Sequence, residues 1–408
     1  MPIPLWYPLD ADGEPIWHEP IAPSEDILPV DPSAEAPTGY SDDQRGVAGG
    51  FIGDPDVMDT WATSSLTPQI AGGWEYDPDL WARVAPMDLR PQAHEIIRTW
   101  LFSTVVRSHL EDGVLPWKHA AISGWILDPD RKKMSKSKGN VVTPADMLTD
   151  YGSDAVRYWA ASGRPGTDTA FDLGQMKVGR RLAIKILNAS KFALLLGAEL
   201  DAAAITDPVD KALLASLADV VVSATTAFDG YNYTRALERT ETFFWSFCDD
   251  YIELIKERAH GARGDQPAAS AKATLALALS IQLRLFAPFL PFVTEEVWSW
   301  WQSGLVHQAP WPSAQELSAA SQGANPAVLT DAATVLAAIR KAKSEAKVSM
   351  RARVASAEVS GPATAVARAE LAAGDLTAAG NVENLSFTPT DDPASPDALI
   401  TVVTLASD

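Results

Sequence analysis

The sequence predicts an α/β region first, an all-α bundle after it, and a small α/β region at the C-terminal side. A short apolar run, residues 120–127, has strand length and leads through a lysine-rich loop to a helix start at Thr143. From about residue 208 to residue 311 the apolar spacing is helical throughout. After residue 348 short β-like runs return, such as Ala398-Leu399-Ile400-Thr401-Val402-Val403. The chain is therefore expected to change structural class twice along its length.

A length of 408 residues allows two to four domains. Hydrophobic residues make up 47% of the chain, and no apolar run reaches the length that we expect of a membrane span. The single cysteine, Cys248, excludes internal disulfides and a cysteine-based zinc site, and we interpret it as a buried packing residue. No metal site and no membrane partner are predicted, and a cytoplasmic location is the default expectation.

The net charge of −20 argues against a polyanionic partner for the chain as a whole. Two segments depart from this balance. Residues 131–191 hold 12 Lys/Arg against 5 Asp/Glu, and residues 336–353 hold 6 basic residues against 1 acidic. An acidic body with two basic segments can bind a nucleic acid locally, although ordinary unevenness of charge gives the same pattern.

Residues 1–56 are rich in proline and low in periodicity. Ile3-Pro4-Leu5-Trp6-Tyr7 has the composition of one short strand, and Asp10-Ala11-Asp12-Gly13 that of a turn. We therefore expect an ordered excursion of a larger domain here, because an independent domain needs more periodic apolar pattern.

The most informative stretch is Lys133-Met134-Ser135-Lys136-Ser137-Lys138-Gly139-Asn140. It carries three lysines and two serines in six residues and ends in Gly-Asn, a pair that turns the backbone. The apolar strand precedes it, and Thr143-Pro144-Ala145-Asp146 follows as a helix start with Thr143 at the N-cap. Ligands of open α/β sheets bind at loops in this position, where lysines suit phosphate oxygens. A solvated basic loop or a short targeting patch is the alternative.

This stretch resembles the KMSKS signature of the class I aminoacyl-tRNA synthetases. The resemblance implies a loop that closes over ATP, with Lys136 as the principal transition-state lysine and Lys133 as its partner on the leaving pyrophosphate. The ATP contacts that it implies in the loop are Lys133, Met134, Ser135, Lys136 and Ser137.

Residues 56–66, which read Asp-Val-Met-Asp-Thr-Trp-Ala-Thr-Ser-Ser-Leu, resemble a segment of the valine enzymes of this class. The isoleucine enzymes usually carry a Val-Trp-Phe-Asp-Ser-Gly pattern in this place. The chain departs from the valine pattern at Ala62-Thr63, where Phe-Ser is usual, but Trp61 is in place. Core packing at a strand-to-helix junction is the alternative reading of this segment.

A helix is predicted to begin at Arg90, and the four-residue spacing of Ile96 and Trp100 puts both on one of its faces. That face can simply pack on the sheet. The resemblance implies instead that Trp61, Ile96 and Trp100 wall an aliphatic amino-acid pocket. The residues that fall where relatives contact the adenylate are Gln92 and Glu95.

Two helices broken at Gly152-Ser153 are predicted over residues 146–161, with Ser153 as the cap of the second. Residues 179–196 read as a basic amphipathic helix, and residues 331–347 as a helix that ends in the second basic segment. The residues predicted to reach tRNA phosphates are Arg180, Arg181, Lys185, Arg340, Lys341 and Lys343.

The bundle contains an aromatic helix over residues 243–253 and the string Pro288-Phe289-Leu290-Pro291-Phe292-Val293-Thr294-Glu295-Glu296-Val297-Trp298. Thr294 is the predicted N-cap of the helix in that string. The string resembles the anticodon-binding domain of the valine and isoleucine enzymes. We expect its aromatic residues to be core residues, with base stacking as the alternative.

Together these resemblances imply the second half of a Rossmann-like class I catalytic domain over residues 1–140, stem-contact helices over 141–195, an anticodon-binding bundle over 196–312, and a linker with a small α/β region over 313–408. They imply ligation of valine to tRNA-Val with Mg²⁺-bound ATP.

None of the six histidines forms the H-x-G-H string that is the family's first signature. We therefore expect a C-terminal portion that is inactive alone. The hypotheses are a truncated gene product, a mis-called start or one part of a split enzyme, and in the last case the partner is a separate N-terminal synthetase portion. A non-catalytic tRNA-binding module, or one part of a split synthetase, is the alternative.

Overall fold

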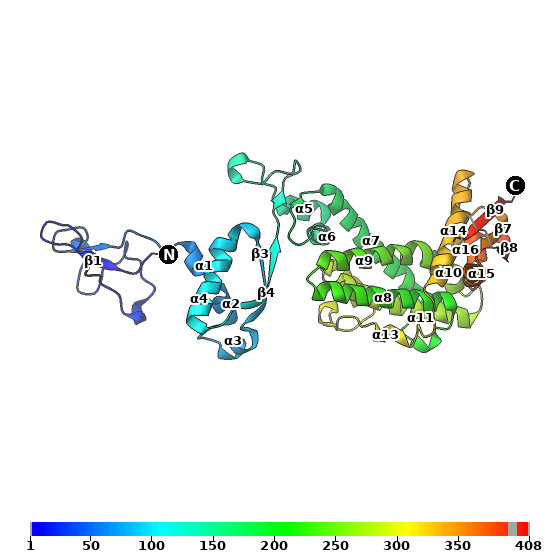
Figure 1. The fold of residues 1–408 in the computed structure, drawn as a ribbon, viewed down its shortest axis with the longest axis horizontal. Helices are drawn as coiled ribbons and strands as arrows, with labels where there is room; N and C mark the ends of the chain where they lie inside the picture. Colours follow the sequence, from blue (N-terminus) through cyan, green and yellow to red (C-terminus); the bar gives the residue numbers. More distant parts are fainter. Residues whose placement is uncertain (1, 391–397, 407–408) are drawn as a thin grey trace. The chain divides into compact units, whose positions relative to one another are not determined.

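The computed structural model describes residues 2–390 and 398–406 and divides the chain into two compact units, one ending at Gly124 and one beginning at Trp125 (Figure 1). The division lies before the KMSKS-like loop, whereas the sequence analysis placed this loop at the end of the first domain. The helices predicted to contact the tRNA stem, the bundle and the C-terminal region all fall within the second unit.

The first unit opens with the antiparallel pair β1 (Trp6–Pro8) and β2 (Phe51–Gly53). Trp6, Val30 and Phe51 form a small buried cluster between the loops, and the indole of Trp6 donates to the carbonyl of Glu35 at 2.8 Å. Short 3₁₀ turns cover Glu25–Ile27 and Asp42–Gln44. The predicted short strand is present, shifted toward Pro8.

A β-α-β unit follows in the same part of the chain. The parallel strands β3 (Met87–Ala93) and β4 (Trp117–Ser123) pair from Met87 opposite Trp117 to Ala93 opposite Ser123. The helices of this region are α1 (Thr60–Ser64), α2 (Thr67–Gly72), α3 (Pro78–Val84) and α4 (Phe102–Asp112).

The prediction of a helix from Arg90 is therefore wrong. Residues 90–93 belong to β3, and helical geometry begins with a 3₁₀ turn at His94–Ile96 and a π turn at Ile97–Leu101. The alternating burial of Arg90 and Gln92, on either side of exposed Pro91, fits a strand, and the ladder with β4 fixes it.

The predicted strand over residues 120–127 is divided in two. Its first part belongs to β4, and after Gly124-Trp125 the chain enters β5 (Ile126–Leu127), which pairs in parallel with β6 (Thr169–Ala170). The second unit continues with α5 (Pro144–Tyr151), α6 (Ser153–Ala161) and α7 (Leu173–Leu195). Thr143 is at the N-cap of α5 as predicted, while Ser153 is the first residue of α6, with Gly152 in the cap position.

Helix α7 begins six residues before its predicted start at Gly179 because Asp172 caps it. The carboxylate of Asp172 accepts from the amides of Gly174 at 2.7 Å and Gln175 at 3.3 Å.

The predicted helical bundle is confirmed (Figure 1). Its buried side chains form one core with those of α7 and the C-terminal region. Its helices are α8 (Pro208–Asp229), α9 (Tyr233–Ser246), α10 (Ile252–Ala259), α11 (Asp265–Phe286) and α12 (Pro291–Ser299). Two further helices, α13 (Gln315–Ser318) and α14 (Ala327–Glu345), follow in the range predicted as a linker and a basic helix. A π turn, Phe247–Tyr251, joins α9 to α10, and short 3₁₀ turns lie at Ala202–Ala204 and Val306–Gln308. Cys248 is buried here, as predicted.

Helix α8 requires a correction to the sequence analysis. Within the described residues it is long and apolar enough, by length and composition, to cross a membrane. In the structure it packs in the bundle with Leu213, Leu214 and Leu217 fully buried, and it carries a buried carboxylate at Asp210. These features are those of a core helix.

The predicted aromatic core of the 288–298 string is confirmed for Phe289 and Trp298, which are buried, but is wrong for Phe292, whose exposed fraction is 63%. The predicted cap is also wrong, because α12 begins at Pro291 and Thr294 lies inside it, buried and bonded to the carbonyl of Leu290. The carboxylate of Asp154 in α6 bonds the amides of Phe292 at 3.1 Å and Val293 at 2.8 Å instead.

The C-terminal region is α/β, as predicted. Strand β7 (Val354–Gly361) lies between β8 (Val382–Pro389), which is parallel to it, and β9 (Ile400–Leu405), which is antiparallel. Helices α15 (Ala363–Glu370) and α16 (Ala373–Gly380) connect β7 to β8.

Candidate functional site

The KMSKS-like loop is held at its base by two side chains, Asp128 and Asn140. The buried carboxylate of Asp128 accepts from the amide of Lys132 at 2.7 Å and from the side-chain amide of Asn140 at 2.7 Å. Asn140 also donates to the carbonyl of Lys133 at 3.2 Å and accepts from the amide of Ser135 at 3.0 Å. The loop is therefore anchored at both of its ends by one hydrogen-bonded pair.

The bond from the Lys132 amide, followed by the bond from Asn140, lowers the pKa of Asp128 from its ordinary value. Asp128 accordingly stays ionised at neutral pH and keeps accepting both bonds. Sequence reasoning missed this residue. Its place directly after β5, at the foot of the loop, was the available signal.

The side chains of the loop are directed to different partners. The Lys133 ammonium lies 4.0 Å from the centre of the Trp125 ring, a cation–π contact that leaves the lysine exposed. The hydroxyls of Ser135 and Ser137 are 3.3 Å apart, and Met134 is half-buried. The backbone turns at Gly139 with φ +65°, as the Gly-Asn pair predicts. The side chain of Lys136 lies outside the part of the chain that the structure describes.

In the first unit Trp100 is brought against α1. Its indole nitrogen donates to the carbonyl of Ser64 at 2.8 Å and lies 3.4 Å from the hydroxyl of Thr67. Trp61 is half-buried within α1 and Ile96 is half-buried in the turn after β3. The role of these three side chains as pocket walls stays a prediction.

The two predicted adenylate contacts lie in different surroundings. Gln92 is buried in β3, and its Oε1 has no hydrogen-bond partner within the described residues, whereas Glu95 is exposed. Beside Gln92 on the same strand is Arg90, which no sequence feature singled out. Its guanidinium carbon lies 3.1 Å from the centre of the Trp100 ring and 4.9 Å from that of Trp117. Burial lowers the pKa of Arg90 to about 10.

Of the basic residues predicted on α7, Arg180 and Arg181 are exposed, and Arg180 donates to the carbonyl of Asp150. Lys185 is half-buried and forms an ion pair with Asp249 at 2.9 Å. The helix carries Lys177 and Lys191 as well and no acidic residue over its whole length. This basic helix is a suitable surface for phosphates on a chain with a net charge of −20.

On α14 the structure separates three residues that the sequence grouped. Lys343 is buried, and its ammonium donates to the carbonyls of Met350 at 2.9 Å and Gly380 at 2.7 Å, so its predicted contact with tRNA is wrong for this structure. Lys341 is exposed beside Glu345, and Arg340 bonds the carbonyl of Asp249 at 2.8 Å. Lys341 and Arg340 remain candidates for phosphate contact.

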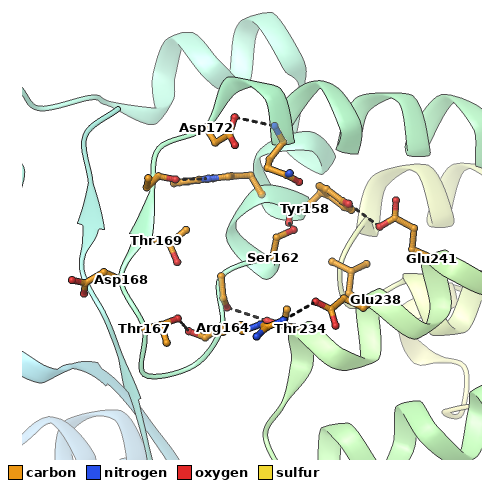
Figure 2. Close-up of a pocket in the computed structure, with 15 residues that line it drawn as sticks. Tyr158, Ser162, Arg164, Thr167, Asp168, Thr169, Asp172, Thr234, Glu238 and Glu241 are labelled. Carbon is orange, nitrogen blue, oxygen red and sulfur yellow. Dashed lines mark hydrogen bonds and ion pairs between the residues drawn. The ribbon is translucent and has the colours of Figure 1, made fainter. Parts of the chain in front are cut away.

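A cavity of about 510 Å³ opens between α6, β6, the start of α7 and α9 (Figure 2). Tyr158 bonds Glu241 at 2.7 Å across it, and Arg164 lies 3.8 Å from Glu238. With Asp168 and Asp172 on its other side, the lining carries four carboxylates against one guanidinium. The excess of negative charge disfavours phosphate here, and polyanion binding is expected on the exposed side of α7 instead.

Comparisons with known proteins agree with this geometry. Residues 1–172 match the family described as tRNA synthetases class I (I, L, M and V), and residues 210–359 match the anticodon-binding domain of tRNA ligase.

Among curated relatives, the valine–tRNA ligase of Thermobifida fusca is 66% identical over 96% of this chain and 44% of its own length. That of Salinispora arenicola is 60% identical over 97% of this chain and 48% of its own length. The chain thus spans a little less than half the length of these relatives.

A solved structure from Agrobacterium radiobacter K84, LeuRS in a ternary complex with tRNA and LeuAMS, shares the fold with a TM-score of 0.60. Its sequence is 20% identical to this chain, and the match covers 79% of this chain and 41% of the LeuRS chain. Residues 1–172 are therefore similar to the class I tRNA synthetases, and relatives of the chain at 66% and 60% identity are named valine–tRNA ligases.

Proposed function

We propose that the chain acts as part of a valine–tRNA ligase, which activates valine with ATP and esterifies it to tRNA-Val. The observation that carries the proposal is the KMSKS-like loop, anchored by Asp128 and Asn140, in a chain whose relatives at 66% and 60% identity bear that name. A cytoplasmic location is part of the proposal.

In the activation step the carboxylate of valine attacks the α-phosphorus of ATP, and pyrophosphate leaves. The side chains position the reactants and neutralise the charge of the phosphates, and they need not exchange protons with the reactants. Lys136 and Lys133 carry this role, and Ser135 and Ser137 bond phosphate oxygens. For Lys133 the step requires that its ammonium leave the Trp125 ring, on which it lies at 4.0 Å.

Mg²⁺ enters as the counter-ion of ATP. Among the described residues there is no group of three or more His, Cys, Asp or Glu side chains that could hold a metal ion. The phosphate oxygens of ATP are therefore the proposed ligands of Mg²⁺.

Trp61, Ile96 and Trp100 are proposed to select the aliphatic side chain of valine by burial. A pocket of this kind distinguishes one methylene by about 1–3 kcal/mol. Gln92 is the adenylate contact that the surroundings favour, because its buried Oε1 has no partner within the described residues and can accept a hydrogen bond from a ligand or another chain.

The first unit also has features that favour a partner polypeptide. Buried atoms of Arg90, Gln92 and Thr99 have no hydrogen-bond partner within the described residues. Helix α4 exposes Phe102, Val106 and Leu110, which share one face at a spacing of four. We propose that a separate N-terminal synthetase portion packs on this surface and that catalysis requires it.

The test is ATP–pyrophosphate exchange with valine. The 408-residue chain alone is expected to give no exchange, and the chain mixed with the complementary N-terminal portion of the Thermobifida fusca relative is expected to give it. Lys136→Ala in the mixture should lower exchange by at least about 100-fold, because a preorganised charge on the transition state is lost.

Lys132→Ala is the matched control, because the Lys132 side chain pairs with Asp130 outside the loop signature, and it should change exchange by less than twofold. Robust exchange by the isolated chain would contradict the requirement for a partner. Full exchange in the Lys136→Ala mixture would contradict the role of the loop.

A non-catalytic tRNA-binding module is the second candidate, favoured by the absence of acidic residues on α7 and by the match of residues 210–359 to the anticodon-binding family. Filter binding of tRNA-Val separates the two functions. Binding by the isolated chain that Lys136→Ala leaves unchanged, together with no exchange in any mixture, would favour the module.

A further inference from the structure

The exposed ring of Phe292 points to a surface that the proposed loop chemistry does not explain. Phe292 follows the first residue of α12, and its backbone is fixed by the two bonds that Asp154 makes to the start of that helix. Its neighbours Leu290 and Val293 are buried, so the exposure belongs to this one ring and not to a frayed segment. Single exposed apolar side chains are common on protein surfaces, so this ring is informative through the hollow that it lines.

Phe292 lines a hollow of about 420 Å³ between α5, α6, α7 and α12. Ile184, half of whose surface is exposed, supplies a second apolar wall, and Tyr151 and Ser153 supply hydroxyls. The guanidinium of Arg180 also lines it and is held there by its bond to the carbonyl of Asp150. The volume lies within the range of small-ligand sites.

The basic residues beside the hollow indicate which class of ligand it could bind. Arg180 belongs to α7, whose five lysines and arginines face no acidic residue of the same helix. The carboxylate of Asp154 is occupied by the two α12 amides that it caps. A flat apolar ring beside a basic helix matches a nucleotide, which stacks by its base and is held by its phosphate.

We propose that this hollow takes an unpaired base of the bound tRNA, stacked on Phe292, with Arg180 on its phosphate. The proposal rests on tRNA binding by the chain. It adds a contact that recognises an unpaired base, in addition to the contacts that basic residues make with phosphates. The two residues have different roles. Phe292 contributes base stacking, which does not depend on the salt concentration, whereas Arg180 contributes a cation for an RNA phosphate, and that interaction weakens as the salt concentration rises.

The experiment is a titration of the 408-residue chain with tRNA-Val transcript over a range of salt concentrations. Phe292→Leu is expected to weaken binding by about 5- to 150-fold, since stacking on an aromatic ring has that magnitude, with no change in the salt slope. Arg180→Gln should weaken binding and reduce the salt slope by about 1. Phe292→Trp keeps the ring face and should bind at least as tightly as the unchanged chain.

Tyr76→Leu is the matched control, because Tyr76 is 74% exposed and is not proposed to touch RNA or a partner chain; it should leave binding within twofold. Circular dichroism melting is expected to be the same for Phe292→Leu and the unchanged chain, since the ring is largely outside the core. A tRNA labelled with 2-aminopurine at each unpaired position in turn should show quenching at one position with Phe292 or Trp and not with Leu.

Unchanged tRNA affinity in Phe292→Leu would overturn the proposal while leaving tRNA binding intact. Loss of self-association or of protein binding in that variant, with tRNA affinity retained, would assign the ring to a protein contact and overturn it as well. No tRNA binding by the unchanged chain, together with valine-dependent exchange in the two-part mixture, would overturn it without touching the proposed function.

Discussion

Two buried arginines, one in each unit, lie in opposite surroundings. Arg258 in α10 is fully buried and bonds Asp210 at 2.8 Å through both terminal nitrogens, and its Nε lies 3.0 Å from Asp375. Arg90 in β3 is buried against the rings of Trp100 and Trp117, and its Nε and Nη2 have no partner within the described residues. The same side chain is thus fully paired in the second unit and incompletely paired in the first.

The pKa values of the two arginines differ because their partners differ. Burial works against the charge of Arg258, but the two carboxylates outweigh it and raise the pKa of Arg258 above its ordinary value. Burial alone acts on Arg90 and lowers its pKa to about 10. The network of Arg258 joins α8 and α10 of the bundle to α16 of the C-terminal region, so these elements complete one another within the chain. Among the described residues, both units keep some buried polar atoms without a hydrogen-bond partner, but only in the first unit are such atoms part of a charged group, the guanidinium of Arg90.

Arg258→Met is the largest test of this comparison. It leaves the carboxylate of Asp210 buried without its cation, while Asp375 keeps its ion pair with Arg263 at 2.7 Å, and we expect the second unit to lose about 3–5 kcal/mol of unfolding free energy. The measurement is urea unfolding followed by labelling of the Cys248 thiol, which is buried in the same bundle. Arg239→Met on α9, an exposed arginine, is the matched control. A loss below about 1 kcal/mol would mean that the network adds no net stability.

Lys343→Met is expected to have an intermediate effect. It removes the two bonds to the carbonyls of Met350 and Gly380 and should destabilise the second unit by about 1–3 kcal/mol. Because Lys343 is buried, the salt slope of tRNA binding should not change in this variant. Lys341→Met, at an exposed position of the same helix, is expected to leave the stability of the second unit unchanged and to reduce the salt slope of tRNA binding. A reduced salt slope in Lys343→Met would return that residue to the RNA surface.

Arg90→Met should have a small effect, in contrast to the same substitution at Arg258. It removes a desolvated cation and two cation–π contacts together, so we expect the unfolding free energy of the first unit to change by no more than about 1 kcal/mol. Hydrogen exchange of the β3 amides in the isolated chain measures it. A large loss would show that the two rings satisfy the guanidinium. In the mixture with the N-terminal portion, Arg90→Met should lower ATP–pyrophosphate exchange if the hydrogen-bond partners of Arg90 lie on that portion.

The smallest effect concerns pH. Burial raises the pKa of the Cys248 thiol from its ordinary 9.0 to about 12. The unfolded thiol therefore releases its proton from about pH 9 while the folded one keeps it, so the stability of the second unit should fall as pH rises above 9. Cys248→Ala should flatten this slope between pH 9 and 10, and the native thiol should resist alkylation at pH 8. Rapid alkylation of the native chain would contradict its burial.

Much of the architecture was readable before the structure. The break between α5 and α6 at Gly152, the helical bundle and the α/β class of the C-terminal region follow from caps, breakers and apolar spacing that act within a few residues. The strand order of the C-terminal sheet was not predicted. The lysine loop was readable from its own string. Its anchoring was not, because the bond between Asp128 and Asn140 closes across twelve residues.

By itself the sequence determined that the bundle is helical, where the cationic loop begins and turns, and which family the chain resembles. The tertiary structure decided what each buried or exposed group meets. It placed Lys343 on two carbonyls, replaced the expected Thr294 cap by Asp154 from 138 residues away, and left Phe292 at the surface. Local patterns fix backbone conformation within a turn or a strand, whereas the partner of a side chain depends on elements that only the folded chain brings together.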